Sequence, residues 1–428
     1  MRFLILMVCG LYLSGCASHV KFYDRFEVDE PAYHVSNLYL DQYGDLYKSS
    51  DASLPNAQGQ PDTLRCAFDR ELCRRTVRLP QDNLDVWRAE QDSRWDMSAQ
   101  RIIDDLKASG GARPIVVLIH GFRVPEAGKD YELAQAKIES AAPNGITPYY
   151  IHVHWDGRNS SMVGVANAWW EAQWSGPQVG FRLRRLLNLI AEKYNMAAVT
   201  DETFEGGPTV RILTHSSGAF VGAAIVSDTG ASLPCLKDKE FQIGSHGIKR
   251  NKCGPTYLAY DENRDSQDIS NLDSVPQIRD LRMGMLAPAT AAVAFTGSTQ
   301  EGWSGAGLLT GPESALIIAY NPKDEIITKF GLPTGLGGES GLAANPDMIC
   351  SIVDRFQSPN GAYILPMNFY RMDAFRAEYK THDFSIYLGQ AAFSNFANVL
   401  MGAALPDRID KNECLAMIAQ WDAEFEDN

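Results

Sequence analysis

The sequence predicts an α/β fold, with a mostly parallel central sheet flanked by helices, an N-terminal elaboration and loop insertions. Short apolar runs that are continuous rather than alternating recur along the chain, which is typical of strands buried on both faces. Stretches with apolar residues at helical spacing lie between these runs. The 428 residues are 45% hydrophobic and 21% charged, which suits a folded chain with a substantial core.

The first 15 residues are predicted to be an export signal. A short apolar run at residues 3–13 follows a basic residue and is too short to span a bilayer. Residues 13–16 (Leu-Ser-Gly-Cys) resemble the bacterial lipobox, in which the cysteine is lipidated and becomes the new N-terminus. The resemblance implies a membrane anchor at Cys16, and the non-acidic Ala17 implies the outer membrane of a bacterial envelope. An ordinary secretory signal with an incidental Cys16 is the alternative.

The remaining cysteines predict three disulfides. Of the 8 cysteines, Cys9 lies in the signal and Cys16 is the lipidation candidate, which leaves an even number that suits an oxidising compartment. Short loops favour pairing of neighbours along the chain. The predicted pairs are Cys66 with Cys73, Cys235 with Cys253, and Cys350 with Cys414. No zinc-finger spacing of Cys and His is present, so we expect no structural metal.

The elements are predicted in the following order. Residues 16–92 are expected to be a strand and loop elaboration with a hairpin at residues 35–48, and residues 93–428 a single α/β domain. A helix at residues 92–109 has apolar residues at helical spacing and ends at Gly110-Gly111.

Within the domain, buried strands alternate with helices, as in a parallel sheet. The predicted strands are residues 114–119, 149–155, 210–214, 282–286 and 315–320, and the clearest helices are residues 181–194 and 219–226. Irregular segments at residues 228–280 and 297–312 are typical of lids or binding surfaces.

A serine follows the third predicted strand and precedes a helix of small residues, in the sequence Thr214-His215-Ser216-Ser217-Gly218. This is the arrangement of a nucleophile elbow, in which a sharp turn exposes the serine oxygen and aims backbone N–H groups at a developing oxyanion. Gly218 meets the need for a small flanking residue. Thr214 stands where the usual motif has glycine, so the packing before the turn must accommodate a larger side chain. A simple turn without chemistry is the alternative.

His120 and Gly121 directly follow the first buried strand, upstream of the elbow. With these two motifs, residues 95–400 resemble the α/β-hydrolase superfamily of esterases and lipases. The resemblance implies that the turn after His120-Gly121 supplies one oxyanion N–H and that the residue after the nucleophile supplies the other, which assigns Phe122 and Ser217. The Thr-His-Ser-Ser-Gly elbow, together with residues 286–289 (Leu-Ala-Pro-Ala), also resembles a broad bacterial group within the superfamily.

Chain order in this superfamily is Ser, then Asp or Glu, then His. The histidines after Ser216 are His246 and His382, and His246 lies in a polar insertion between two cysteines. His382 is therefore the predicted base, and Asp324, just after a buried strand, is the predicted orienting acid.

Two of these roles, the orienting acid and the nucleophile, have alternative candidates. Glu325 or Asp354 is an alternative acid, and Ser217 is a rival nucleophile.

The expected activity is hydrolysis of a small-molecule or lipid ester through an acyl-enzyme, without a cofactor. A non-catalytic envelope protein that uses the scaffold as a binding module is the alternative. Nucleic acid is not an expected partner, because 39 Lys and Arg face 53 Asp and Glu, and no dense basic cluster occurs.

A second chemistry is suggested by the spacing of His152, His154 and Asp156, which is that of metallo-β-lactamase-like hydrolases. Gly157 stands where that family has its next histidine. We therefore expect two buried strand histidines and no metal.

Overall fold

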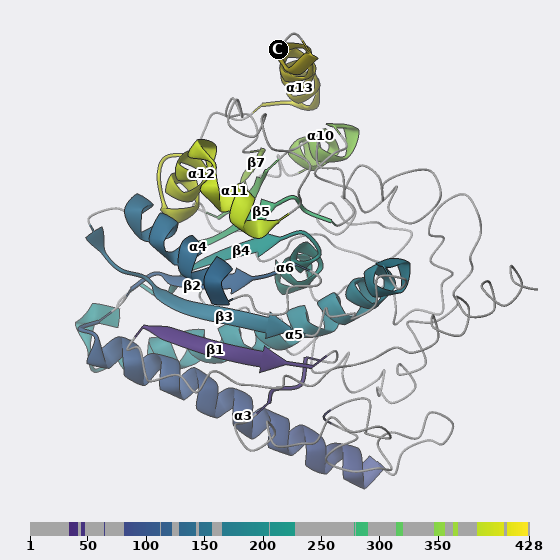
Figure 1. Cartoon of the computed structure of the whole chain (residues 1–428). Helices are drawn as coiled ribbons and strands as arrows, with labels where there is room; N and C mark the ends of the chain where they lie inside the picture. Colours follow the sequence, from purple (N-terminus) through teal and green to yellow (C-terminus); the bar gives the residue numbers. More distant parts are fainter. Residues whose placement is uncertain are drawn as a thin grey trace, which may run out of the picture.

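The computed structural model describes most of the α/β framework of the chain (Figure 1). The described residues are 34–41, 44–47, 64, 81–111, 113–121, 128–142, 145–155, 165–204, 206–226, 278, 280–289, 314–319, 346–355, 363–366, 383–405 and 409–426. The predicted signal, the lipidation candidate Cys16 and the cysteines at 66, 73, 235 and 253 lie outside them.

A seven-stranded sheet forms the centre, in the order β1-β3-β2-β4-β5-β6-β7. Every neighbouring pair is parallel, which confirms the predicted α/β class. The strands are β1 Val35–Leu40, β2 Ile115–Ile119, β3 Tyr149–Trp155, β4 Thr209–His215, β5 Asp280–Leu286, β6 Ala315–Ile318 and β7 Tyr363–Pro366. Strands β2 and β3 are buried at every position, as their continuous apolar runs predict.

Helices cover both faces of the sheet. The helices are α3 Gln81–Ala108, α4 Gly128–Ala141, α5 Val165–Ala198, α6 Gly218–Val226, α10 Pro346–Arg355, α11 Phe384–Gly389, α12 Ala391–Met401 and α13 Lys411–Glu426, with a short 3₁₀ turn η5 Glu202–Phe204. One apolar core joins α3, α5, α6, α10 and α13 to the sheet, and a second joins α4, α11 and α12 to the opposite face. In Figure 1, β1 and α3 lie at one edge of the sheet and β7 at the other.

The strand order reverses direction next to β2. The chain leaves β2 through α4 to reach β3 on one side, and then returns through α5 to β4 on the other side. Crossovers in opposite directions place their helices on opposite faces, so the chain leads from β2 to α4 on one face of the sheet and from β4 to α6 on the other. The carboxyl ends of β2 and β4 are therefore where a parallel α/β sheet forms its binding crevice.

Of the hairpin predicted at residues 35–48, the described residues show the turn back of the chain, with backbone hydrogen bonds from Tyr47 to Tyr39 and from Asp41 to Asp45, both at 3.0 Å. Val35–Leu40, however, pairs in parallel with β3 as an edge strand, and within the described residues the antiparallel return is the bridge between Leu40 and Leu46. The turn that follows β1 packs on α3. Gln91 binds both backbone groups of Leu46 at 2.6 and 3.2 Å, and the indole of Trp87 donates to Asp45 at 3.0 Å. These contacts involve residues of α3 that precede the predicted start at residue 92, and the helix itself begins at Gln81.

Helix α5 also begins earlier than predicted, because glycines that weaken a helix are used here for packing. A Cβ on Gly180 would lie 2.4 Å from the carbonyl oxygen of Val221, and one on Gly176 would lie 2.7 Å from the Cβ of Phe220. Helices α5 and α6 thus approach so closely that no side chain fits between them. The short strand β7 was not predicted at all, since four residues carry no clear periodicity.

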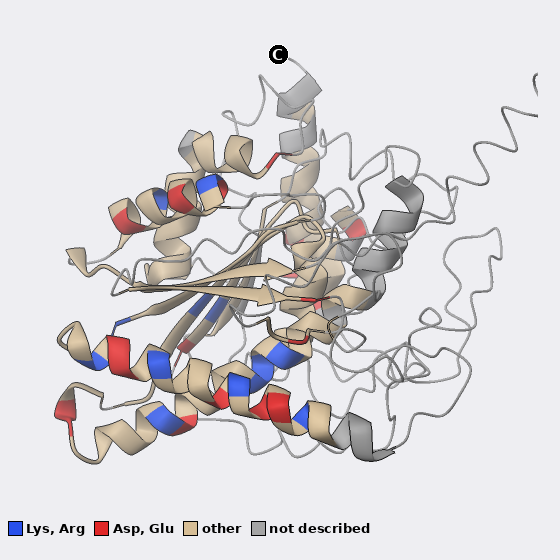
Figure 2. Cartoon of the chain, turned by 60° about the horizontal axis from the view of Figure 1, so that its bottom comes forward, with Lys and Arg blue, Asp and Glu red and all other residues tan. Residues whose placement is uncertain are grey.

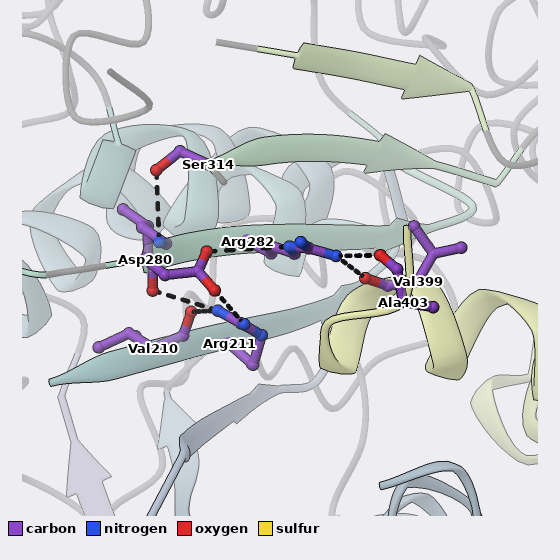
Figure 3. Close-up of polar contacts among 8 residues, drawn as sticks. Val210, Arg211, Asp280, Arg282, Ser314, Val399 and Ala403 are labelled. Carbon is purple, nitrogen blue, oxygen red and sulfur yellow. Dashed lines mark hydrogen bonds and ion pairs between the residues drawn. The ribbon is translucent and has the colours of Figure 1, made fainter. Parts of the chain in front are cut away.

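A buried arginine near the start of β5, Arg282, holds the end of α12 against the sheet (Figure 3). Arg282 donates from one nitrogen to the carbonyl oxygens of Val399 and Ala403, at 2.6 and 2.8 Å. Arg211, its register partner on β4, is paired with Asp280. Cations near a helix carboxyl terminus are favourable, because the last carbonyl groups carry partial negative charge.

Charges of both signs are interspersed on the outer helices. Figure 2 shows Lys and Arg alternating with Asp and Glu along α3. Two α3 carboxylates pair with α5, Asp92 with Arg185 at 3.0 Å and Asp96 with Lys193 at 2.8 Å. Among the described helices, none combines the length and the apolar character needed to cross a membrane.

The predicted pairing of Cys350 with Cys414 is confirmed. The disulfide joins α10 to α13, and both cysteines are fully buried. It links segments 64 residues apart in the sequence.

Candidate active site

Ser216 occupies the turn between β4 and α6, at the carboxyl edge next to β2. Its backbone is left-handed, with φ 53°, which non-glycine residues seldom adopt. Such a conformation costs on the order of 1–3 kcal/mol and persists where surrounding contacts enforce it. The predicted sharp strand-to-helix turn is therefore present at this serine.

The end of β5 holds the backbone of this turn. The Ser216 N–H donates to the carbonyl oxygen of Leu286 at 2.9 Å, and the Ala289 N–H donates to the Ser216 carbonyl oxygen at 3.1 Å. Ala287 is itself left-handed, with φ 45°. Residues 286–289, which resemble those of a bacterial group, thus hold the backbone of Ser216 in its left-handed conformation through hydrogen bonds from the end of β5.

The turn after β2 lies directly against the elbow. A Cβ on Gly121 would lie 2.8 Å from the Cβ of Ser216 and 3.0 Å from the carbonyl oxygen of His215. A Cβ on Gly218 would lie 2.7 Å from the carbonyl oxygen of His120. Both glycines are required by this contact, because any larger residue would separate the two loops.

Thr214 is accommodated by a glycine one turn into α6. Its side chain is fully buried, and its Cγ2 would lie 2.8 Å from a Cβ on Gly222. The glycine that the usual motif has before the serine is thus replaced by a glycine on the facing helix. The departure of Thr214 from the motif is therefore compatible with the elbow geometry.

A frame of buried residues fixes the His120-Gly121 turn. The His120 N–H donates to the hydroxyl of Tyr131 on α4 at 2.9 Å, and the Trp155 indole donates to the His120 carbonyl oxygen at 2.8 Å. Sequence reasoning missed Tyr131 and Trp155 as parts of this site. The sequence feature that could have indicated them is their place in α4 and β3, the two elements that directly follow β2 along the chain.

The side chain of His215, next to Ser216, contacts the C-terminal helices. The ring of His215 stacks on Phe384 with centroids 5.0 Å apart and lies 5.7 Å from the ring of Tyr387. The adjacent Asp383 lies close enough to Asp130 on α4 to add to burial in raising the pKa of Asp130. The first residues of α11 therefore border the elbow, and the start of α4 lies near them.

His152 and His154 are both buried on one face of β3, as predicted. His154 stacks on Tyr39 at 4.5 Å and its Nε2 lies 3.1 Å from the Asn37 side-chain oxygen. Asp156 lies outside the described residues, and within them no group of three or more His, Cys, Asp or Glu is arranged to hold a metal ion.

Burial sets the protonation of these histidines. It lowers the pKa of His152 to about 4, and it lowers the pKa of His154 well below the ordinary value, with His120 and His152 as further causes. Both side chains are therefore neutral in the folded protein at pH 7.

Acid should destabilise the fold through His152. The unfolded chain binds the proton near pH 6.5 and the folded chain only near pH 4, so stability is present above pH 6.5 and is lost as pH falls through this window. Between pH 7 and pH 5, the wild type should lose about 2 kcal/mol more unfolding free energy than His152→Leu. Urea unfolding at both pH values measures this difference, and equal losses in the two proteins would contradict it. Leucine is a matched variant, since the His152 Nε2 has no hydrogen-bond partner among the described residues.

The other predicted site residues divide into two groups. Ser217 is described and fully buried, and Asp354, the alternative acid, is exposed on α10. The residues that lie outside the described part of the chain are Phe122, Asp324, Glu325, His246 and His382. The structure therefore brings together the elbow, the His120-Gly121 turn and the start of α11.

Comparison of the chain with protein-family models, curated proteins and solved structures finds no match. The fold and the geometry of the serine turn are thus the basis for any functional assignment.

Proposed function

We propose that the protein is a serine hydrolase with an α/β-hydrolase fold, which cleaves carboxylic esters through an acyl-enzyme. The observation that carries this proposal is the left-handed Ser216 between β4 and α6, pressed against the Gly121 turn at the point where the strand order reverses. Strain of this kind at a polar residue in the binding crevice is typical of a nucleophile elbow.

His382 is the proposed base. It precedes Phe384 by two residues in the sequence, and Phe384 stacks on His215, the neighbour of the nucleophile. Two residues of extended chain span about 7 Å at most. This limited reach supports a base from the segment before α11 over His246, which lies far from any described element in the sequence.

Asp324 is the proposed orienting acid. It follows the end of β6 by a short stretch of sequence, and the carboxyl ends of parallel strands share one edge of the sheet. The exposure of Asp354 on α10 argues against it as the alternative, since an orienting carboxylate is most effective when it is shielded from water.

The reaction follows from these roles. Ser216 Oγ attacks the ester carbonyl while His382 takes its proton, and the N–H groups of Phe122 and Ser217 bind the oxyanion. The C–O bond to the alcohol then breaks as His382 returns the proton to the leaving oxygen. Water attacks the acyl-enzyme by the same route and releases the carboxylic acid and free Ser216.

Labelling with a fluorophosphonate tests the proposal. The folded wild type should form an adduct that mass spectrometry maps to Ser216, and Ser216→Ala should form none. An adduct at Ser217 would instead make that residue the nucleophile. A folded wild type without any adduct would contradict the enzymatic proposal and favour a binding module built on the same scaffold.

We further propose that the enzyme is anchored to a bacterial envelope membrane through lipidated Cys16. The disulfide between Cys350 and Cys414 supports export, because such bonds persist in oxidising compartments. The anchor would hold the enzyme at the outer membrane, where small-molecule or lipid esters are its substrates.

A further inference from the structure

The pairing of β4 with β5 changes at its carboxyl end, next to Ser216. Leu286 is the register partner of His215, and its carbonyl oxygen accepts the Ser216 N–H at 2.9 Å, as in a regular parallel ladder. The next bond of that ladder would run from the N–H of residue 288 to the Ser216 carbonyl oxygen. Residue 288 is proline, which has no N–H, so the regular ladder ends here.

A shift of the chain by one residue supplies another donor. The N–H of Ala289 donates to the Ser216 carbonyl oxygen at 3.1 Å. The shift occurs at Ala287, whose backbone is left-handed with φ 45°. An extra residue with a left-handed backbone is typical of one class of β-bulge, where it is usually glycine. Ala287 keeps this conformation although its Cβ disfavours it and the following proline restricts it further.

The two bonds hold both peptide units that flank Ser216. A peptide unit is planar, so a partner at the N–H fixes the plane before the residue and a partner at the carbonyl fixes the plane after it. The Ala219 N–H, 3.0 Å from the same carbonyl oxygen, ties the second plane to α6 as well. With both planes fixed, the direction in which Cβ leaves the Ser216 backbone is set. The hydroxyl can then move only by rotation about the Cα–Cβ bond.

We propose that Ala287 is a positioning residue, whose left-handed backbone brings the Ala289 N–H to the Ser216 carbonyl and thereby sets the direction of the serine side chain. The inference rests on the proposed function, because it takes Ser216 as the nucleophile. Ala287 does not touch substrate and acts through the backbone of residues 286–289. In a regular strand, residue 289 would face β6, as Met285 does when it accepts the Ala319 N–H at 2.8 Å.

Asparagine and threonine at position 287 separate backbone conformation from size. The two side chains have similar volumes and both are polar, but asparagine is enriched in left-handed conformations and a β-branched residue rarely adopts them. Because Ala287 is fully buried, the two variants should suffer comparable costs of added size and polarity. Ala287→Gly completes the set, since glycine accepts the left-handed backbone and adds no volume.

The test measures kcat and KM for a p-nitrophenyl ester and the rate of fluorophosphonate labelling, with unfolding in urea as a check that each variant is folded. Misplacement of a reacting group by about 1 Å can cost about 10²-fold in rate, so kcat in Ala287→Thr should lie about 10- to 100-fold below that in Ala287→Asn. Labelling should slow in parallel, because it uses the same hydroxyl. KM should differ by less than about threefold, and Ala287→Gly should keep a kcat within about threefold of the wild type.

Equal kcat in Ala287→Thr and Ala287→Asn, or a loss in Ala287→Gly as large as that in Ala287→Thr, would overturn the inference. If Ala287→Thr does not fold, Pro288→Ala replaces it, because it restores the N–H of a regular ladder and frees residue 287 to become extended. It should lower kcat several-fold at constant KM, and an unchanged kcat would overturn the inference. A folded wild type that takes up no fluorophosphonate rejects the proposed function and this inference with it, whereas a labelled wild type with equivalent variants rejects the inference alone.

Discussion

Ester hydrolysis should fall by about 10⁴- to 10⁶-fold in Ser216→Ala, in His382→Ala and in the double variant alike. The three losses are expected to be similar because the two residues act as one unit in the proposed mechanism. A serine hydroxyl is a weak nucleophile until a base takes its proton, and the base has no function without the nucleophile. The measurement is kcat for p-nitrophenyl esters, with unfolding in urea as a check that each variant is folded.

His246→Ala is the matched control for this experiment, because His246 is the other histidine that follows Ser216 in the sequence. It should hydrolyse the ester at a rate close to that of the wild type. If His246→Ala lost activity and His382→Ala kept it, the base would be assigned to the wrong histidine. Additive losses in the double variant would show that Ser216 and His382 do not act together.

The disulfide between Cys350 and Cys414 is expected to supply about 4 kcal/mol of unfolding free energy. It closes a loop of 64 residues, and the loss of that constraint increases the entropy of the unfolded chain. The variant Cys350→Ala/Cys414→Ala should therefore unfold at a clearly lower urea concentration than the wild type. Both side chains are fully buried, so part of the loss will also come from packing around α10 and α13.

Reduction provides the control for this prediction. The wild type in reductant should lose stability, and the double alanine variant should show a smaller additional loss, since the other cysteines are present in both proteins. A variant as stable as the oxidised wild type would mean that α10 and α13 stay docked without the covalent link. A cross-linked peptide containing both cysteines should be detected only in the wild type.

Periodicity was sufficient to predict the central strands. The apolar runs of β2 to β6 are continuous because helices cover both faces, and each predicted range overlaps the observed strand. It did not predict the parallel pairing of β1 with β3, because alternating burial has the same pattern in a hairpin as in a parallel edge strand. The choice between them depends on the contacts of the following turn with Gln91 and Trp87, which are distant in the sequence.

The serine turn was predictable from its local sequence, but its support was not. Small residues around Ser216 indicate a sharp turn, whereas the threonine at 214 argues against the usual packing. Gly222 resolves this conflict from the facing helix. Tyr131 and Trp155 were also missed, because hydrogen bonds between side chains and a distant backbone leave no periodic signal.

The sequence by itself determined the alternation of strands and helices, the serine at the end of β4, the glycine turn after β2 and the pairing of Cys350 with Cys414. These features depend on the order of residues and on spacing along the chain. Only the tertiary structure decided that Ser216 is left-handed, that Gly121 contacts it and that Tyr131 and Trp155 hold the backbone of His120. The reason is physical: backbone strain and the direction of a hydrogen bond are imposed by neighbours from other strands and helices, which the local sequence does not specify.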